Sequence, residues 1–333
     1  MKIRLMIASP DSDYTEYLSK VLLGKYSDVF EVSVCSNEDR LREMVAGHRA
    51  DIVLAERELD SAVDMHSVRL SFVLIDEVAR VSNSGGEYKN VKKYQRISSL
   101  VKEMIGAYAE VSSSSEVYGS LSAQITAFWS PVGGSGKTTV ALAYAANCVT
   151  RGKKTVYLDL QNFSCSLVYF QQNDKSISTL FQKLDSNVEL LLQSIRQQDS
   201  GSGIFYFSQP ENYDDINILT SEDIRNLIDG CAKGVDELVI DLSSICNEKI
   251  CKVLDFASQI FIVLDGSRVS AAKWTQFQTQ NNVYEQVRSK VKLVGNKGAA
   301  LDASSVNGLV SLPYVQSSDP VAIYKTLSAS FSI

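Results

Sequence analysis

Short apolar runs alternate with amphipathic segments along the whole chain. In the first 110 residues, four runs have the length and composition of buried strands, and segments of helical periodicity separate them. These predicted strands are 3–8, 29–35, 50–55 and 71–75. A closing amphipathic helix is predicted over 96–108. Strands that alternate with helices predict a parallel sheet covered on both faces, and hence an α/β fold of flavodoxin-like type.

A serine-rich segment, residues 111–123, separates the first region, 1–110, from a second α/β region at 124–333. In the second region the predicted strands are 125–129, 155–160, 204–208, 236–241, 259–264 and 291–294. Helices are predicted over 178–196, 274–287 and 320–327. Residues 210–220 are predicted to form a surface loop, after which Ser221 is the expected N-cap of another helix. We therefore expect two domains, the second with a mainly parallel sheet.

The second region opens with a strand, a glycine-rich turn and a helix, which is the order found in phosphate-binding loops. Glycines let backbone N–H groups approach phosphate oxygens, and a helix N-terminus adds partial positive charge. We predict that Lys137 contacts the β- and γ-phosphates of a nucleotide and that the Thr138 hydroxyl binds Mg²⁺. The predicted nucleotide-binding residues of this loop are Gly133, Gly134, Ser135, Gly136, Lys137, Thr138 and Thr139.

Two aspartates lie near the ends of predicted buried strands, Asp159 and Asp241. An apolar strand that ends in a carboxylate has the form of a Walker B element, whose acid binds Mg²⁺ directly or through water. Asp241 is therefore predicted to be a metal ligand together with Thr138, and the predicted catalytic groups are Lys137, Asp159 and Asp241. The alternative for Asp241 is a strand-end aspartate that caps the next turn.

Composition restricts the classes of protein that this chain can belong to. Its 333 residues are 45% apolar and 22% charged, as in soluble globular proteins. The net charge of −6 argues against binding of nucleic acid, and six cysteines without CxxC spacing argue against a zinc site. No apolar run approaches the roughly 18–20 residues of a membrane-spanning helix. We therefore predict a cytoplasmic protein without direct membrane insertion.

The order of elements in the first region resembles the receiver domain of two-component signalling. Receivers place a phospho-accepting aspartate after the third strand, where this chain has Glu56. Their acidic pair after the first strand is shifted here to Asp11 and Asp13, and Lys93 is a loose match to the receiver lysine. The resemblance implies a degenerate receiver that serves protein contacts. Glu56 is then either a solvated strand-end glutamate or a mimic of the phosphorylated state.

The loop sequence GGSGKT resembles the deviant phosphate-binding loop of the ParA/MinD family. Val132 stands where that family has a signature lysine, which contacts phosphate across a dimer. Asp159 matches the first aspartate of the family's D-x-D run, but Gln161 replaces the second, which supports attack by water. The resemblance implies ATP and Mg²⁺ as cofactors, and the departures at Val132 and Gln161 imply weak or absent ATP hydrolysis. It also implies that Asn296, at the end of a strand, contacts adenine; a turn asparagine is the alternative.

A degenerate receiver followed by a deviant-loop ATPase resembles the TadZ/CpaE branch of the ParA/MinD family, which positions Tad (Flp, type IVb) pilus machinery. This resemblance implies a homodimer and partners among the Tad pilus assembly proteins, such as the secretion ATPase or inner-membrane platform proteins. It also implies recruitment to the pole or the inner face of the membrane through those partners. The alternatives are an active ATPase that positions flagella, plasmids or chromosomes, a response-regulator-type signalling protein and, less well supported, a bacterial tyrosine kinase.

Overall fold

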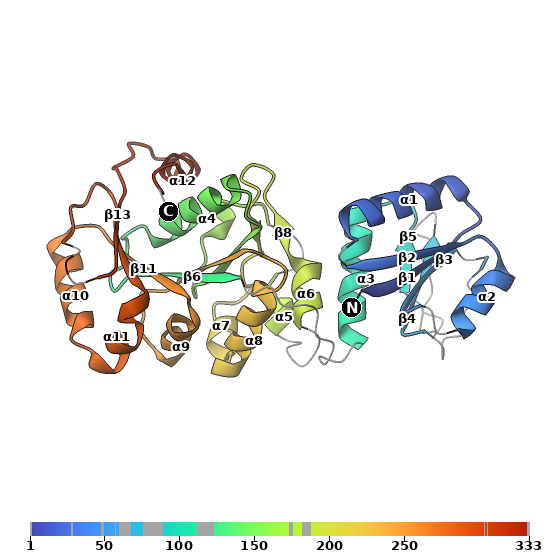
Figure 1. The fold of residues 1–333 in the computed structure, drawn as a ribbon, viewed down its shortest axis with the longest axis horizontal. Helices are drawn as coiled ribbons and strands as arrows, with labels where there is room; N and C mark the ends of the chain where they lie inside the picture. Colours follow the sequence, from blue (N-terminus) through green and yellow to red (C-terminus); the bar gives the residue numbers. More distant parts are fainter. Residues whose placement is uncertain are drawn as a thin grey trace. The chain divides into compact units, whose positions relative to one another are not determined.

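The structure is a computed structural model of the chain. It describes residues 2–27, 29–47, 50–56, 58–59, 68–75, 89–111, 123–172, 176–181, 188–302, 304 and 306–331. Two compact units make up the chain (Figure 1): residues 1–119 with 185–194 form the first, and residues 120–184 with 195–333 form the second. Most of the segment expected to be a linker, 111–123, lies outside the described residues. The predicted domain limits remain a prediction.

The first unit contains a parallel sheet with the strand order β2-β1-β3-β4-β5. These strands are β1 (Ile3–Ala8), β2 (Phe30–Cys35), β3 (Ile52–Glu56), β4 (Leu70–Ile75) and β5 (Lys89–Lys92). The helices are α1 (Ser12–Lys25), α2 (Glu38–Ala46) and α3 (Ile97–Val111). The four predicted strands and the closing helix are confirmed. The strand β5 was not predicted because Val91 is its only buried apolar residue.

The second unit contains a larger sheet with the strand order β13-β12-β11-β6-β10-β7-β9-β8. Its pairs are parallel except for the short antiparallel pair of β8 and β9. In chain order the strands are β6 (Gln124–Trp129), β7 (Thr155–Leu160), β8 (Gln197–Gln198), β9 (Phe205–Tyr206), β10 (Glu237–Leu242), β11 (Gln259–Leu264), β12 (Val291–Gly295) and β13 (Leu309–Ser311). The α/β class expected for both regions is therefore confirmed.

Helices cover both faces of the second sheet, with α4 and α12 on one face and α8 and α9 on the other (Figure 1). In residues 124–333 the helices are α4 (Lys137–Thr150), α5 (Ser178–Phe181), α6 (Val188–Ile195), α7 (Asp215–Ile218), α8 (Ser221–Ala232), α9 (Glu248–Phe256), α10 (Arg268–Gln278), α11 (Asn281–Val287) and α12 (Pro320–Ser328), with 3₁₀ turns η2 (Ser166–Val168) and η3 (Arg288–Lys290). Most of α6 groups with the first unit.

Three details of the predicted helices are wrong. The N-cap of α8 is Thr220 and not Ser221, because the Thr220 side chain accepts from the backbone of Asp223 while the Asp223 carboxylate accepts from the backbone of Thr220. The loop predicted over 210–220 contains the short helix α7. The helix predicted over 274–287 is two helices, α10 and α11, and α10 begins early because Ser267 caps it.

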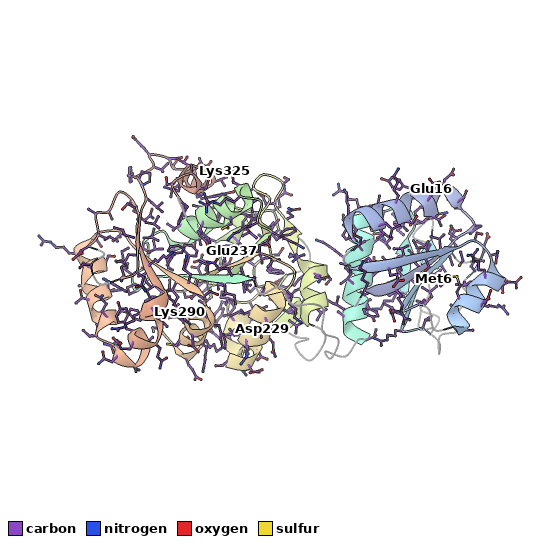
Figure 2. The ribbon with its side chains drawn as sticks, in the orientation of Figure 1. Met6, Glu16, Asp229, Glu237, Lys290 and Lys325 are labelled. Carbon is purple, nitrogen blue, oxygen red and sulfur yellow. The ribbon has the colours of Figure 1, made fainter. Side chains whose placement is uncertain are left out.

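Buried side chains fix both sheets. Met6 in the first unit and Glu237 in the second are fully buried, and Figure 2 labels both. The Glu237 carboxylate accepts hydrogen bonds from Thr126 Oγ1 at 2.6 Å and Tyr144 Oη at 3.0 Å, and it pairs with Lys153 Nζ at 2.8 Å. A buried carboxylate requires such partners. Glu237 therefore ties β10 to β6 and α4 and has a structural role.

The helix α4 lies between the sheet and α12. Its apolar side chains pack against β6, β7, β10 and β11 on one side and against Tyr324, Leu327 and Phe331 on the other. Asn147 Nδ2 also donates to the carbonyl of Ser328 at 2.8 Å. This helix is apolar on nearly all sides, as expected for a helix buried between two layers. It holds the glycine loop at its N-terminus in a fixed position relative to the strand ends.

Candidate functional site

The glycine loop joins the end of β6 to the start of α4. Gly134 and Gly136 have φ angles of 75° and 89°, in the left-handed region that favours glycine. A Cβ atom at Gly136 would lie 2.4 Å from Nδ2 of Asn296, whereas one at Gly133 would meet nothing within 4 Å. Gly136 is therefore required both by its backbone conformation and by the close approach of a neighbouring side chain.

Two side chains from the turn after β12 hold this loop. Asn296 Nδ2 donates to the carbonyl of Ser135 at 2.8 Å, and Lys297 Nζ donates to the carbonyl of Gly134 at 2.8 Å. Lys297 was not among the predicted site residues, because an exposed lysine in a turn resembles any solvated charge. Its place directly after the strand-end asparagine was the available signal. The predicted contact of Asn296 with adenine remains a prediction; the bond that the structure shows is to the loop.

Lys137 is the first residue of α4 and is 8% exposed. Its Nζ donates to Ser244 Oγ at 2.9 Å, and Ser244 Oγ donates to the carbonyl of Val132 at 3.2 Å. Burial lowers the pKa of Lys137, against the charges of Asp241 and Asp159, which raise it. The lysine is thus held at the loop by the segment after β10. The Ser244 contact was not predicted.

Thr138 and Asp241 meet directly, as expected for two ligands of one cation. Thr138 Oγ1 donates to Asp241 Oδ2 at 2.5 Å, and Tyr157 Oη donates to the same oxygen at 3.0 Å. Gln161 Nε2 donates to both Asp241 Oδ2, at 2.8 Å, and Thr138 Oγ1, at 3.1 Å. Asp241 is fully buried and its described bonds are to side chains. The alternative in which it caps the next turn is therefore wrong.

Asp159 lies beside Asp241 because β7 and β10 pair in parallel with these two residues in register. Asp159 accepts from Ser164 Oγ at 2.6 Å and from the backbone of Gln161 at 3.0 Å. Burial, and then the charge of Asp159, raise the pKa of Asp241 to about 7. Burial also raises the pKa of Asp159, although the hydrogen bonds from Ser164 and Gln161 act to lower it. A divalent cation at this place would stabilise the ionised form of both carboxylates.

The residues at this place fit Mg²⁺ and a nucleotide phosphate. Asp241 Oδ1 is buried and has no hydrogen-bond partner in the structure, so one hard oxygen is free to bind a cation. The described part of the chain contains no group of three or more His, Cys, Asp or Glu residues that could hold a metal. A cation held by Thr138 and Asp241 therefore needs further oxygen ligands from phosphate or water, which is the usual situation for Mg²⁺. Thr139 Oγ1 lies 3.3 Å from Tyr169 Oη at the outer side of α4.

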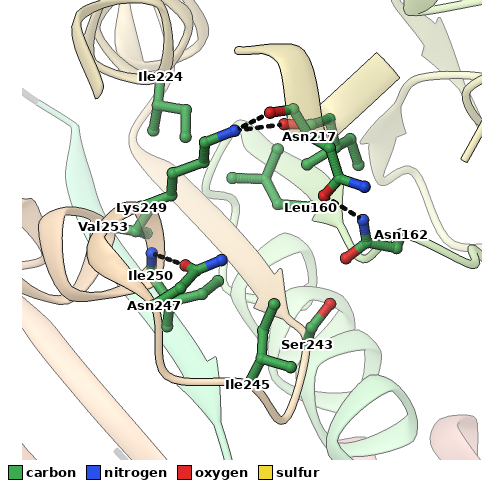
Figure 3. Close-up of a pocket in the computed structure, with 11 residues that line it drawn as sticks. Leu160, Asn162, Asn217, Ile224, Ser243, Ile245, Asn247, Lys249, Ile250 and Val253 are labelled. Carbon is green, nitrogen blue, oxygen red and sulfur yellow. Dashed lines mark hydrogen bonds between the residues drawn. The ribbon is translucent and has the colours of Figure 1, made fainter. Parts of the chain in front are cut away.

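A small apolar cavity lies beside this site, and Figure 3 shows the residues that line it. Leu160 and Ser243 come from the ends of β7 and β10, while Lys249 Nζ donates to backbone carbonyls of Ile216 and Asn217. Its volume of about 20 Å³ suits about one water molecule. The cavity is too small for a nucleotide.

The receiver-like unit has a charged cluster of its own. Lys93 Nζ lies 2.7 Å from Glu56 Oε1 and 2.9 Å from Asp11 Oδ2, and Ser9 Oγ donates to Glu56 at 2.5 Å. Glu56 is therefore an ion-paired residue, and the prediction of a solvated strand-end glutamate is wrong. Lys93 lies directly after β5, whereas Asp13 is exposed in the first turn of α1. The match of Lys93 to the receiver lysine remains a prediction.

Comparisons with known proteins agree with this arrangement. Residues 1–109 match the family model described as TadZ-like, receiver domain. A ParA family ATPase from Chlorobium tepidum TLS has a TM-score of 0.51 and 18% identity, over 63% of this chain and 90% of that one. A cell division ATPase MinD from Pyrococcus furiosus has a TM-score of 0.49 and 13% identity, over 62% and 97%. Cobyrinic acid a,c-diamide synthase from Mycobacterium smegmatis, with bound ATP analog and magnesium, has a TM-score of 0.47 and 14% identity, over 62% and 93%.

No sequence among the curated proteins matches the chain significantly. Within the described residues, no helix is both long enough and apolar enough to cross a bilayer. At 18% identity the likeness to the Chlorobium protein shows a shared fold. The chain thus joins a region that matches a TadZ-like receiver domain to a second α/β unit with the fold of a ParA family ATPase.

Proposed function

We propose that this chain is a positioning factor of the TadZ/CpaE type that binds ATP and Mg²⁺. The observation that carries the proposal is the direct bond of 2.5 Å between Thr138, at the start of α4, and the buried Asp241 at the end of β10. These two side chains are the pair that a magnesium nucleotide needs at a phosphate-binding loop. A TadZ-like receiver domain on the same chain favours a positioning factor over other P-loop proteins.

In the proposed complex each residue has a defined task. The backbone amides of 133–137 cradle the phosphates, the Lys137 ammonium balances their charge, and Thr138 with Asp241 holds Mg²⁺. Bound Mg²⁺ supplies charge neutralisation for the β- and γ-phosphates. Asp159 orients water and the residues around Asp241. The loop residue Val132 is buried and uncharged, so it adds nothing to phosphate stabilisation.

We further propose that hydrolysis is weak or absent. An attacking water needs a group that orients it and accepts its proton. Gln161, which contacts both proposed metal ligands, can orient water but has no carboxylate that could accept a proton. The proposed nucleotide therefore acts as a bound ligand that sets the conformation of the site.

The proposed partners are Tad pilus assembly proteins, either the secretion ATPase or the inner-membrane platform proteins, and a second copy of this chain in a homodimer. These contacts would recruit the protein to the pole or the inner face of the membrane. Exposed apolar side chains near the site offer a surface for such contacts: Phe163, Leu167, Val168, Tyr213, Ile218 and Ile245. Light scattering with and without ATP tests the dimer, and titration with a purified secretion ATPase tests that partner.

The first test measures ATP affinity and steady-state turnover with Mg²⁺. Lys137→Ala is expected to reduce affinity at least tenfold, because it removes the buried ammonium. Lys273→Ala, at an exposed position of α10, is the matched control and is expected to leave affinity unchanged. Turnover barely above background in the wild type supports the proposal. Rapid turnover that Lys137→Ala abolishes would favour an active positioning ATPase, and no ATP binding would refute the cofactor assignment.

A further inference from the structure

One side chain contacts both proposed metal ligands. Gln161 follows β7 directly, and its Nε2 donates to Asp241 Oδ2 at 2.8 Å and to Thr138 Oγ1 at 3.1 Å. Its backbone N–H donates to Asp159 Oδ1 at 3.0 Å. A single residue therefore engages both carboxylates and the threonine hydroxyl of the site.

One of these bonds uses an oxygen that Mg²⁺ requires, Thr138 Oγ1, and the other holds Asp241 Oδ2, next to the unpartnered Oδ1. Mg²⁺ binds oxygen at about 2.0–2.1 Å in octahedral geometry. An amide NH₂ is a donor only, so its hydrogens point at the lone pairs that a cation would take. The amide nitrogen of Gln161 lies within hydrogen-bond distance of Thr138 Oγ1 and Asp241 Oδ2. A cation bound beside Thr138 Oγ1 would therefore meet the amide hydrogens. Gln161 and Mg²⁺ therefore compete for the hydroxyl oxygen of Thr138.

We propose that Gln161 determines the Mg²⁺ affinity of this site and couples metal binding to the partly exposed segment 162–168. The proposal rests on the function proposed above. When Mg²⁺ enters with the nucleotide and binds Thr138 Oγ1, the Gln161 amide gives up its bond to Thr138 and, as it moves, its bond to Asp241 Oδ2. Because hydrogen bonds to a charged group are stronger than neutral ones, their loss lowers the affinity for Mg²⁺ by about tenfold relative to a site without them.

The residues that follow Gln161 transmit this change to the surface. Asn162 Nδ2 donates to Asn217 Oδ1 at 2.7 Å, and the ring of Phe163 stacks on Tyr213 with centroids 5.7 Å apart. Phe163 is 80% exposed. A movement of Gln161 therefore alters the contact of this segment with α7 and the apolar surface that both present. Metal binding in the site thereby changes the exposed surface around Phe163.

The test is a Mg²⁺ titration of the binding of a fluorescent ATP analogue to the full chain. Gln161→Met keeps the size of the side chain and removes both donors. It is expected to lower the Mg²⁺ concentration at half-maximal binding by about tenfold. Gln276→Met, at an exposed position of α10, is the matched control and is expected to match the wild type.

A second readout is hydrogen exchange at the backbone amides of 162–168. In the wild type, Mg²⁺ added to the ATP complex is expected to change their exchange rates, whereas in Gln161→Met the rates are already changed and Mg²⁺ has no further effect. Equal Mg²⁺ dependence in the two proteins overturns the inference while the proposed function stands. If the analogue does not bind the wild type at saturating Mg²⁺, the proposed function fails. If Gln161→Met does not fold, wild-type exchange that is insensitive to Mg²⁺ overturns the inference.

Discussion

Replacement of Gly136 by alanine is expected to destabilise the second unit by about 2–5 kcal/mol. At the φ of 89° an alanine lies in the left-handed region, which costs about 1–2 kcal/mol. The new Cβ would lie 2.4 Å from Asn296 Nδ2, so the Asn296 side chain must move and lose its 2.8 Å bond to the Ser135 carbonyl. A buried polar group left without its partner costs about a further 1–3 kcal/mol.

Urea unfolding followed by tryptophan fluorescence measures this cost. Both tryptophans of the chain, Trp129 and Trp274, lie in the second unit, so their fluorescence reports its unfolding. Gly133→Ala is the control, since its Cβ meets nothing within 4 Å, and it is expected to change the free energy of unfolding by less than about 0.5 kcal/mol.

A double-mutant cycle separates the two costs at Gly136. If the Cβ contact matters, the double variant loses less free energy of unfolding than the sum of the losses in Asn296→Ala and Gly136→Ala, because either change alone already removes the bond to Ser135. The cost of the left-handed backbone remains in the double variant. Equal stability of Gly136→Ala and Gly133→Ala would refute the reasoning, and strict additivity in the cycle would refute its steric part.

Three further predictions concern charged groups. Burial raises the pKa of Asp51, but hydrogen bonds from Arg4 outweigh this effect, so the pKa of Asp51 is lowered. The ionised carboxylate therefore stabilises the fold at pH values above the pKa that Asp51 has in the unfolded chain. The wild type should therefore lose stability relative to Asp51→Asn as pH falls below about 4 in urea unfolding followed by circular dichroism. Lys93→Met should destabilise the first unit by about 2 kcal/mol, because it leaves the Glu56 carboxylate without its ion-pair partner; an unchanged melting temperature would contradict this. Burial raises the pKa of Asp241 to about 7, so the free energy of unfolding of the wild type should fall as pH rises from about 4 to 7. At pH 8 without ligand, Asp241→Asn should be more stable than the wild type by on the order of 2 kcal/mol. Equal unfolding curves of the two proteins at pH 8 would count against this prediction.

Local features of the site were predictable from the sequence. The strand, the glycine turn and the helix that begins at Lys137 are adjacent in the chain, and an apolar strand ending in Asp241 needs no knowledge of its neighbours. The contact of Thr138 with Asp241 followed from motif chemistry. Where two capping residues stand side by side, as at Thr220 and Ser221, only the acid three residues later decides between them, and that acid pairs with Thr220.

Other features depend on strand order and register, which no local pattern contains. Asp159 and Asp241 become neighbours only because β7 and β10 pair in the observed register. The bonds of Ser244 to Lys137 and of Lys297 to Gly134 join segments more than 100 residues apart. The ion pair of Glu56 and Lys93 depends on the loop after β5, a strand too polar to be predicted. In each case the side chain was visible in the sequence and its partner was not.

The packing of α12 on α4 has a consequence for the energetics of ligand binding. The sheet and α12 enclose α4, and Asn147 Nδ2 fixes its far end to Ser328. The backbone at the N-terminus of α4 is therefore ordered when the chain folds, so its conformational entropy is not lost a second time on binding. Part of the affinity for a phosphate ligand is thus determined by residues 320–331, which never touch that ligand. Substitutions that loosen this distant helix would weaken binding through preorganisation alone.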